Sequence, residues 1–196
     1  FWPEGVKPKS RKWLAENLRA GQLSHVDLAL RRAPGQAPQT YVAFDYAGAE
    51  VRFLRDWPHI TDGRGHMSLL DNRLVVTVDS GEVIAPEGGA VTLDGSSFII
   101  PDVRVKDGSP AVIRLETRST VTAALSLLNR PPLRLMEKAG MPVTLADGEA
   151  VLSGTLALPL KKGNKPDELN YHFAGDLLSV ESDSLIKGRN LKASEL

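Results

Sequence analysis

Apolar and polar residues alternate along most of the chain from about residue 25 onward. A period of two is typical of strands that bury one face and expose the other. The pattern predicts strands around residues 26–31, 42–46, 51–53, 74–79, 98–106, 113–116, 152–160 and 169–173. The turns predicted among them are the segments AGAE, TDGRG, DSGE, PEGG, LDGSS and KDGS. Short strands at this spacing predict an antiparallel meander.

A helical period appears before the first of these strands. A helix is predicted from about Pro8, which suits the first helical turn, to Ala20, with Gly21 as its C-terminal cap. Its apolar stripe includes Trp13, which we expect to dock the helix on the rest of the protein.

Two further helices are predicted beyond residue 120. Val121, Leu125 and Leu128 share one face of the first of them. The pair Pro131–Pro132 must end it, because proline lacks an amide donor. A second short helix is predicted after the prolines, ending near Gly140 and followed by a strand.

Two parts of the chain resemble each other. LSHVDLALRR is echoed by LSGTLALPLK, and FDYAGAEVRF is echoed by YHFAGDLLSV. The offset is 128 residues between Leu28 and Leu156, and 127 residues between Tyr46 and Phe173. Near-equal offsets predict one unit used twice. The first helix-plus-strand unit would cover about residues 1–127, and an incomplete second unit in the same sheet would cover 128–196.

A repeated sheet with one apolar face needs a cover for that face. Burying a Leu-sized side chain contributes about 1.5–3 kcal/mol, and a few short helices can cover only part of a sheet. The sheet must therefore close on itself, pack on a second sheet or be filled by an apolar ligand.

Composition narrows the classes of function. The chain has 196 residues, 42% of them apolar, with Lys+Arg and Asp+Glu balanced at 24 each. This balance gives no reason to expect a nucleic-acid partner. The absence of cysteine excludes disulfides and Cys-ligated metals. No apolar run reaches the length of a transmembrane helix, and from the opening Phe1-Trp2-Pro3 we expect a piece of a longer protein whose anchor lies outside it.

No catalytic constellation stands out. His59, Asp62 and His66 lie in one glycine-containing stretch, but without tight ligand spacing they predict a loop rather than a metal site. The carboxylates between residues 102 and 116 are typical of a solvated face. Neither a GxSxG motif nor a phosphate-binding loop is present. The sequence therefore predicts no enzyme, no cofactor and no metal.

The first helix and the segment near residue 60 resemble the AsmA-like superfamily of bacterial envelope proteins, and above all its YhdP branch. In that branch a helix with the pattern P…P-x-x-R-x-W-L…G precedes strands, and a W-P-x-I/L…G segment follows. The matching residues here are Pro8, Arg11, Trp13, Leu14 and Gly21, then Trp57, Pro58, Ile60, Gly63 and Gly65. The resemblance covers most of the chain.

The resemblance implies a large protein anchored in the inner membrane, with its repeats in the periplasm. Such repeats form a strongly curved antiparallel sheet, an open groove or half-barrel, in which each repeat starts with a short amphipathic helix. Phospholipid acyl chains are thought to slide along its apolar inner face between the inner and outer membranes. The implied partners are these acyl chains and the adjacent repeats of the parent chain.

The residues expected to line this groove are alternating apolar residues of the predicted strands. They are Val26, Leu28, Leu30, Val42, Phe44, Tyr46, Val51, Phe53, Leu156, Leu158, Tyr171 and Phe173. The same residues also fit an ordinary closed core, and both interpretations stay open. Two other functions stay open as well: a structural or protein-binding β module of the envelope without lipid cargo, and, less favoured, a carbohydrate-active β-sandwich enzyme.

Overall fold

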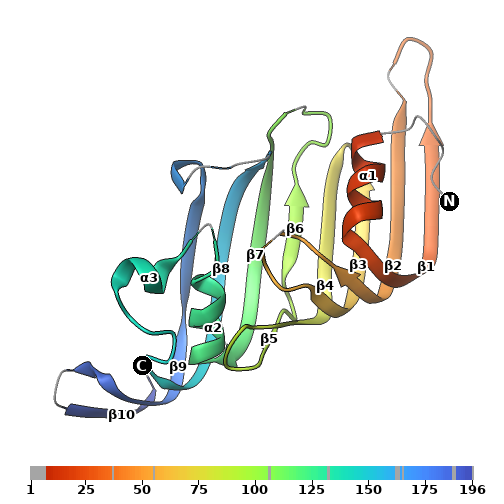
Figure 1. The fold of residues 1–196 in the computed structure, drawn as a ribbon. Helices are drawn as coiled ribbons and strands as arrows, with labels where there is room; N and C mark the ends of the chain where they lie inside the picture. The colour runs from red at the N-terminus through yellow and green to blue at the C-terminus, as the bar shows by residue number, and fades with distance from the viewer. Residues whose placement is uncertain are drawn as a thin grey trace.

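The computed structural model describes residues 8–36, 38–54, 56–105, 107–131, 133–161, 164, 166–186 and 189–195. Ten antiparallel strands form one sheet in the order β1-β2-β3-β4-β5-β7-β8-β9-β10, and β6 pairs with β4 and β7 (Figure 1). The strands are β1 (Leu18–Arg31), β2 (Gln39–Val51), β3 (Ile60–Leu70), β4 (Arg73–Ile84), β5 (Ala90–Thr92), β6 (Ser97–Ile100), β7 (Ser109–Thr120), β8 (Asp147–Leu160), β9 (Asn170–Ile186) and β10 (Arg189–Glu195). Because β1 and β10 lie at opposite ends of this order, the sheet is open.

Three short α-helices, α1 (Pro8–Asn17), α2 (Val121–Leu128) and α3 (Leu135–Ala139), lie on the same side of the sheet (Figure 1). A 3₁₀ turn, η1 (Pro166–Glu168), precedes β9. The mainly β, antiparallel fold with a few short helices is thereby confirmed. The division into units at residues 127 and 128 stays a prediction. The strands on either side of it, β7 and β8, pair without interruption from Ser109 to Thr120.

Three of the six predicted turns are wrong. AGAE lies inside β2, TDGRG inside β3 and DSGE inside β4. The register shifts at these places, and Gly48 and Asp62 have positive φ angles of 60° and 52°. Each is therefore a β-bulge, which inserts a residue and bends a continuous strand instead of reversing it. The long strands are about twice the length that alternation alone predicts.

A reversal that the alternation pattern misses joins β3 to β4. Asp71 and Asn72 are its central residues, with φ angles of 49° and 65°, and Leu70 pairs directly with Arg73. Positive φ at both central residues is the requirement of a two-residue hairpin turn, and Asp and Asn tolerate it well. The strand predicted to continue beyond Ile100 is wrong as far as residue 105, because β6 ends at Ile100, and Lys106 lies outside the described residues.

The first helix ends earlier than its pattern predicts. α1 stops at Asn17, and Gly21 lies inside β1 with a φ of 146° instead of capping the helix. Trp13 is 46% exposed, so the expected docking of this ring is wrong. The helix is fastened at its C-terminal end instead, where the Arg52 amide donates to the Asn17 carbonyl at 2.8 Å.

The other two helices follow their predictions. The Thr120 hydroxyl accepts a hydrogen bond from the Ala123 amide at 3.0 Å and caps α2. The helix stops before the prolines, and α3 ends at Gly140, which has a φ of 65°.

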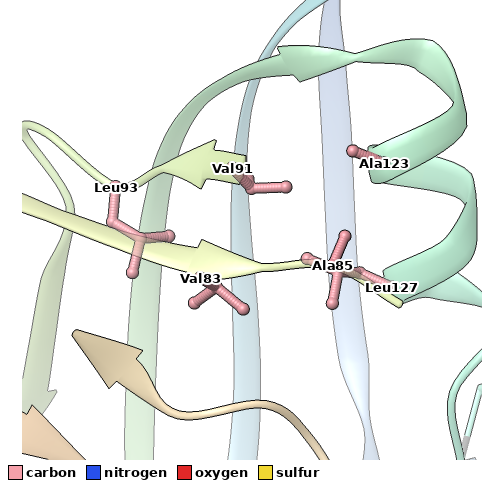
Figure 2. Close-up of a cluster of buried hydrophobic side chains, with 6 residues drawn as sticks. All are labelled: Val83, Ala85, Val91, Leu93, Ala123 and Leu127. Carbon is pink, nitrogen blue, oxygen red and sulfur yellow. The ribbon is translucent and has the colours of Figure 1, made fainter. Parts of the chain in front are cut away.

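The hydrophobic core sits under α2, at one end of the strands. One cluster joins β4, β5 and α2 (Figure 2), and its members are Val83, Ala85, Val91, Leu93, Ala123 and Leu127. A second cluster joins α2 to β8 and β9, and its members are Val121, Ala146, Ala150 and Val180. One helix of eight residues therefore holds together strands from both halves of the chain.

The loop between β2 and β3, residues 52–59, crosses to the α2–α3 connection; we call it the strap. The Trp57 indole donates to the Pro131 carbonyl at 2.7 Å, and the Arg130 guanidinium donates to the Asp56 carbonyl at 2.8 Å. Trp57 also packs on the first core cluster and meets Phe53 edge to face, with ring centroids 5.8 Å apart. The strap thus links residues 74 positions apart in sequence.

Replacing Trp57 by Phe tests the strap. The smaller ring keeps most of the packing but leaves the Pro131 carbonyl without its donor, so we expect a loss of about 1–2 kcal/mol in the free energy of unfolding. Urea unfolding followed by circular dichroism measures it. Trp13→Phe is the matched control, because that ring is exposed, and should stay within about 0.5 kcal/mol of the parent. Equal losses in the two variants would contradict the assignment.

Candidate functional site

The face of the sheet that carries α2 can be traced residue by residue. Ala150 and Leu152 of β8 pack with Val121 of α2. From Glu149 to Ala157, β8 pairs with β9 without a register shift. Alternation therefore places Leu156 and Leu158 on the same face as α2, beyond the end of the core.

Direct register partners extend this face across seven strands. Leu156 faces Ile113 on one side and Tyr171 on the other. The partners continue strand by strand, and the complete set, which we call the apolar row, is Phe44, Met67, Val76, Phe98, Ile113, Leu156 and Tyr171. At about 4.8 Å per strand, six spacings make the row about 29 Å long. Every position in it is apolar or aromatic.

The adjacent residue on each of these strands belongs to the opposite face. The same register links these residues to one another, and this polar row is Asp45, His66, Thr77, Ser97, Arg114, Thr155 and His172. Every one of them is polar or charged. At this level of the sheet, one row is therefore apolar and the adjacent row, on the opposite face, is polar. The next row on that opposite face is mixed, and its members are Ala43, Ser68, Val75, Ile99, Val112 and Ala157.

Two histidines hold Asp45 on the polar face. Its carboxylate accepts hydrogen bonds from His66 and His25, each 2.8 Å from the ring Nδ1. The bond from His66 first, and then that from His25, lowers the pKa of Asp45 from its ordinary value. His59 pairs instead with Glu50 at 3.0 Å. Within the part of the chain that the structure describes, no three His, Asp or Glu residues are placed to hold a metal ion.

The apolar face is largely uncovered away from the core. Leu28 and Leu30 on β1 are 74% and 71% exposed, and Tyr171 on β9 is 50% exposed. None of the apolar row is fully buried. The accessible surface of the chain is 13055 Å², whereas a compact monomer of this 21.2 kDa mass exposes about 9,100 Å². The excess reflects a sheet that is open on its faces.

Eleven of the twelve predicted groove residues lie on strands, and register and alternation place them on this face. Leu28 pairs with Val42, and Val26 and Leu30 follow by alternation. Val51 pairs with Ile60, which packs on the core under α2. Phe53 is the exception in secondary structure, since it lies in the strap rather than in a strand. Their contact with lipid stays a prediction.

The centre of the apolar face is missing from the predicted set. The omitted residues are Met67, Leu69, Leu74, Val76, Phe98, Ile100 and Ile113. Alternation does mark β4, β6 and β7. β3 escapes detection because its glycine-rich start has the composition of a turn.

Tyr46 shows how the aromatic residues lie on this face. Its ring crosses Gly65 of β3, and its hydroxyl donates to the Thr77 carbonyl of β4 at 2.7 Å. A Cβ on Gly65 would lie 2.8 Å from that hydroxyl oxygen and 2.0 Å from the Thr77 oxygen, so only glycine fits beneath. Burial, and then the charge of Asp79, raise the pKa of Tyr46 to about 12.

The remaining charged candidates have structural partners. Asp102 pairs with Arg104 at 2.7 Å, and Arg134 pairs with Glu137 at 3.5 Å. Glu116 pairs in register with Ser153 and belongs to the polar face. None of the described helices is long and apolar enough to cross a membrane.

The fold defines an open antiparallel β-sheet protein whose apolar face is only partly covered by helices. The family model for the YhdP protein matches residues 1–192, so the chain belongs to the YhdP family. This confirms the resemblance seen in the sequence. No curated protein and no solved structure matches the chain.

The Tyr46 hydroxyl makes a pH-dependent contribution to stability. Its folded-state pKa of about 12 lies above the ordinary value of 10.0, so folding favours the neutral phenol. That stability is complete below pH 10 and is lost as the pH rises toward 12. Tyr46→Phe should lower the free energy of unfolding by about 1 kcal/mol at pH 8. The difference from the parent should then shrink above pH 10 in urea titrations.

Tyr41→Phe is the control for this measurement, because Tyr41 lies on the opposite face of the same strand. A parent and a Tyr46→Phe variant that lose stability in parallel above pH 10 would show that Tyr46 is not the group responsible.

Proposed function

We propose that this chain forms part of an apolar β-groove that carries phospholipid acyl chains between the inner and outer membranes of the bacterial envelope. It performs no chemical reaction in this role. The observation that supports the proposal is the apolar row: seven directly paired residues on seven strands, all of them apolar or aromatic.

The chemistry of the apolar face suits a polymethylene chain. Moving an acyl chain from water onto apolar side chains contributes about 0.8 kcal/mol per buried CH₂. Contacts of this kind have no preferred direction, so a chain can slide from one strand to the next without crossing a polar residue. A headgroup stays in solvent, where its charge keeps its hydration.

The edges of the sheet indicate how the groove would continue. β1 pairs with β2 on one side, and all fourteen of its residues are exposed. An open edge of this kind is where the next repeat of a solenoid adds its strands. The proposed partners are therefore adjacent repeats of the parent chain, in a periplasmic protein whose membrane anchor lies outside this segment.

The same open edge favours one alternative. A β module without lipid cargo would use β1 to pair with a strand of an envelope protein. The two functions differ in the cargo on the apolar face. The third possibility, a carbohydrate-active enzyme, gains no support from Glu116, which lies on the polar face, or from Asp102, which is paired with Arg104.

Leu156→Asp and Thr155→Asp form a matched pair for the lipid experiment. The two residues are neighbours on β8 and face opposite sides of the sheet. Native mass spectrometry of the purified chain, with lipid extraction, should find phospholipid on the parent and on Thr155→Asp. Leu156→Asp should lose it, because a carboxylate in the middle of the apolar row repels an acyl chain.

Circular dichroism spectra of the two variants show whether each is folded, and only folded variants are compared. Equal lipid content in the two folded variants would rule out the apolar row as the binding surface. If the unmutated chain is free of lipid and takes up none from phospholipid vesicles, lipid transfer is rejected in favour of the β module.

A further inference from the structure

Two rings lie side by side where the apolar row reaches β9. Tyr171 ends the row, and Phe173 follows it on the same face, with ring centroids 6.0 Å apart and planes inclined by 34°. Tyr171 is 50% exposed and Phe173 is 37% exposed. No described hydrogen bond engages the Tyr171 hydroxyl, so both rings offer apolar surface to a ligand.

Gly154 on β8 determines how the second ring lies. It is the direct register partner of Phe173, and a Cβ added to it would lie 2.1 Å from Phe173 Cδ1. A real contact of that length does not occur, so the ring rests over the glycine, against the sheet. Such a Cβ would also lie 2.7 Å from the His172 carbonyl oxygen, so any larger residue at position 154 would displace both the ring and the β9 backbone.

Tyr46 provides the comparison within the same chain. Tyr46-Ala47-Gly48 and Phe173-Ala174-Gly175 are the echoed segments, and each aromatic ring lies over a glycine of the neighbouring strand. The Tyr46 hydroxyl is bound to the Thr77 carbonyl, which fixes the ring. Phe173 has no hydroxyl, so only packing holds it.

We infer that Tyr171 and Phe173 form an aromatic platform that contacts the acyl chain of a phospholipid, and that Gly154 is the positioning residue that lets the Phe173 ring lie against the sheet. The inference rests on the proposed function. Aromatic rings supply large, rigid contact area at little cost in side-chain entropy. The platform continues the apolar row without a polar interruption, so a chain that lies on the row runs onto it.

Photocrosslinking tests the platform directly. The residue p-benzoylphenylalanine is placed singly at Phe173, His172 and Ile113 of the 196-residue chain. Each protein is irradiated with vesicles of phosphatidylethanolamine and phosphatidylglycerol, and the adducts are mapped by mass spectrometry. His172 is the control, because it lies next to Phe173 on the opposite face. Ile113 reports on the middle of the apolar row.

We expect acyl-chain adducts at Phe173 and Ile113, and few at His172. Adducts at Ile113 with no excess at Phe173 over His172 would overturn the platform and leave the groove intact. Adducts at neither Ile113 nor Phe173 would overturn the proposed function itself. An adduct on the headgroup at Phe173 would also reject the inference, because the platform would then bind the polar end.

The Gly154→Ala variant tests whether Gly154 positions the Phe173 ring. The matched control is Ser153→Ala, because Ser153 is the neighbouring residue on the opposite face. The Gly154 variant should bind a fluorescent acyl-chain lipid about tenfold more weakly, as expected for the loss of about one aromatic contact. Ser153→Ala should bind as the parent does. Unchanged binding by folded Gly154→Ala would show that the glycine does not position the ring. A Gly154→Ala variant that fails to fold would show that the glycine is needed for the pairing of β8 with β9 and would overturn its role as a positioning residue.

Discussion

The register between neighbouring strands is the constraint on which the two-faced sheet depends. Side chains alternate with a period of two, so a slip of one residue in β8 would place Thr155 beside Ile113 and Leu156 beside Val112. The apolar row would then be broken at that strand. The uninterrupted pairing of β7 with β8 over twelve residues makes such a slip costly. The continuity of the apolar face is therefore a property of the hydrogen-bonded backbone as much as of the side chains.

Without their β-bulges, the long strands could not keep their apolar side chains on one face along their whole length. In a regular β3, Ile60 would face away from Gly65 because an odd number of positions separates them, yet Ile60 packs under α2 on the same side. The bulge at Asp62 inserts one extra residue into β3 and so brings Ile60 back to the face of Gly65. The matching shift in β4 lets both Val78 and Val83 contact the core. Bulges thus connect the open apolar row to the covered core on a single face.

The sequence predicts the features of this fold that depend on local patterns, and it misses those that depend on contacts between distant segments. Alternation identifies most strands, and the prolines and Gly140 correctly bound α2 and α3. It fails at Gly48 and Asp62, because the same residues favour a turn and a bulge, and only pairing with a neighbouring strand decides between them. The helical pattern misplaces Gly21 for a related reason, because glycine favours both a helix cap and a β-bulge. Eleven of the twelve groove residues share one face through the period of two, with the bulge near Gly48 adjusting the phase for Val51, whereas Phe53 lies in the strap. The strap bonds of Trp57 and Arg130 join distant segments and leave no local pattern.

Stability and the proposed binding surface are separated along the strands. The buried side chains gather under α2 and are mostly small, with Val180 the largest of those that are almost fully enclosed. The strap and α2 fasten that end, so the far end of the face need not be covered for the sheet to persist. An apolar surface that contributes little to folding is free to contact a mobile ligand. Covering it permanently would add stability but would leave no apolar surface for a ligand.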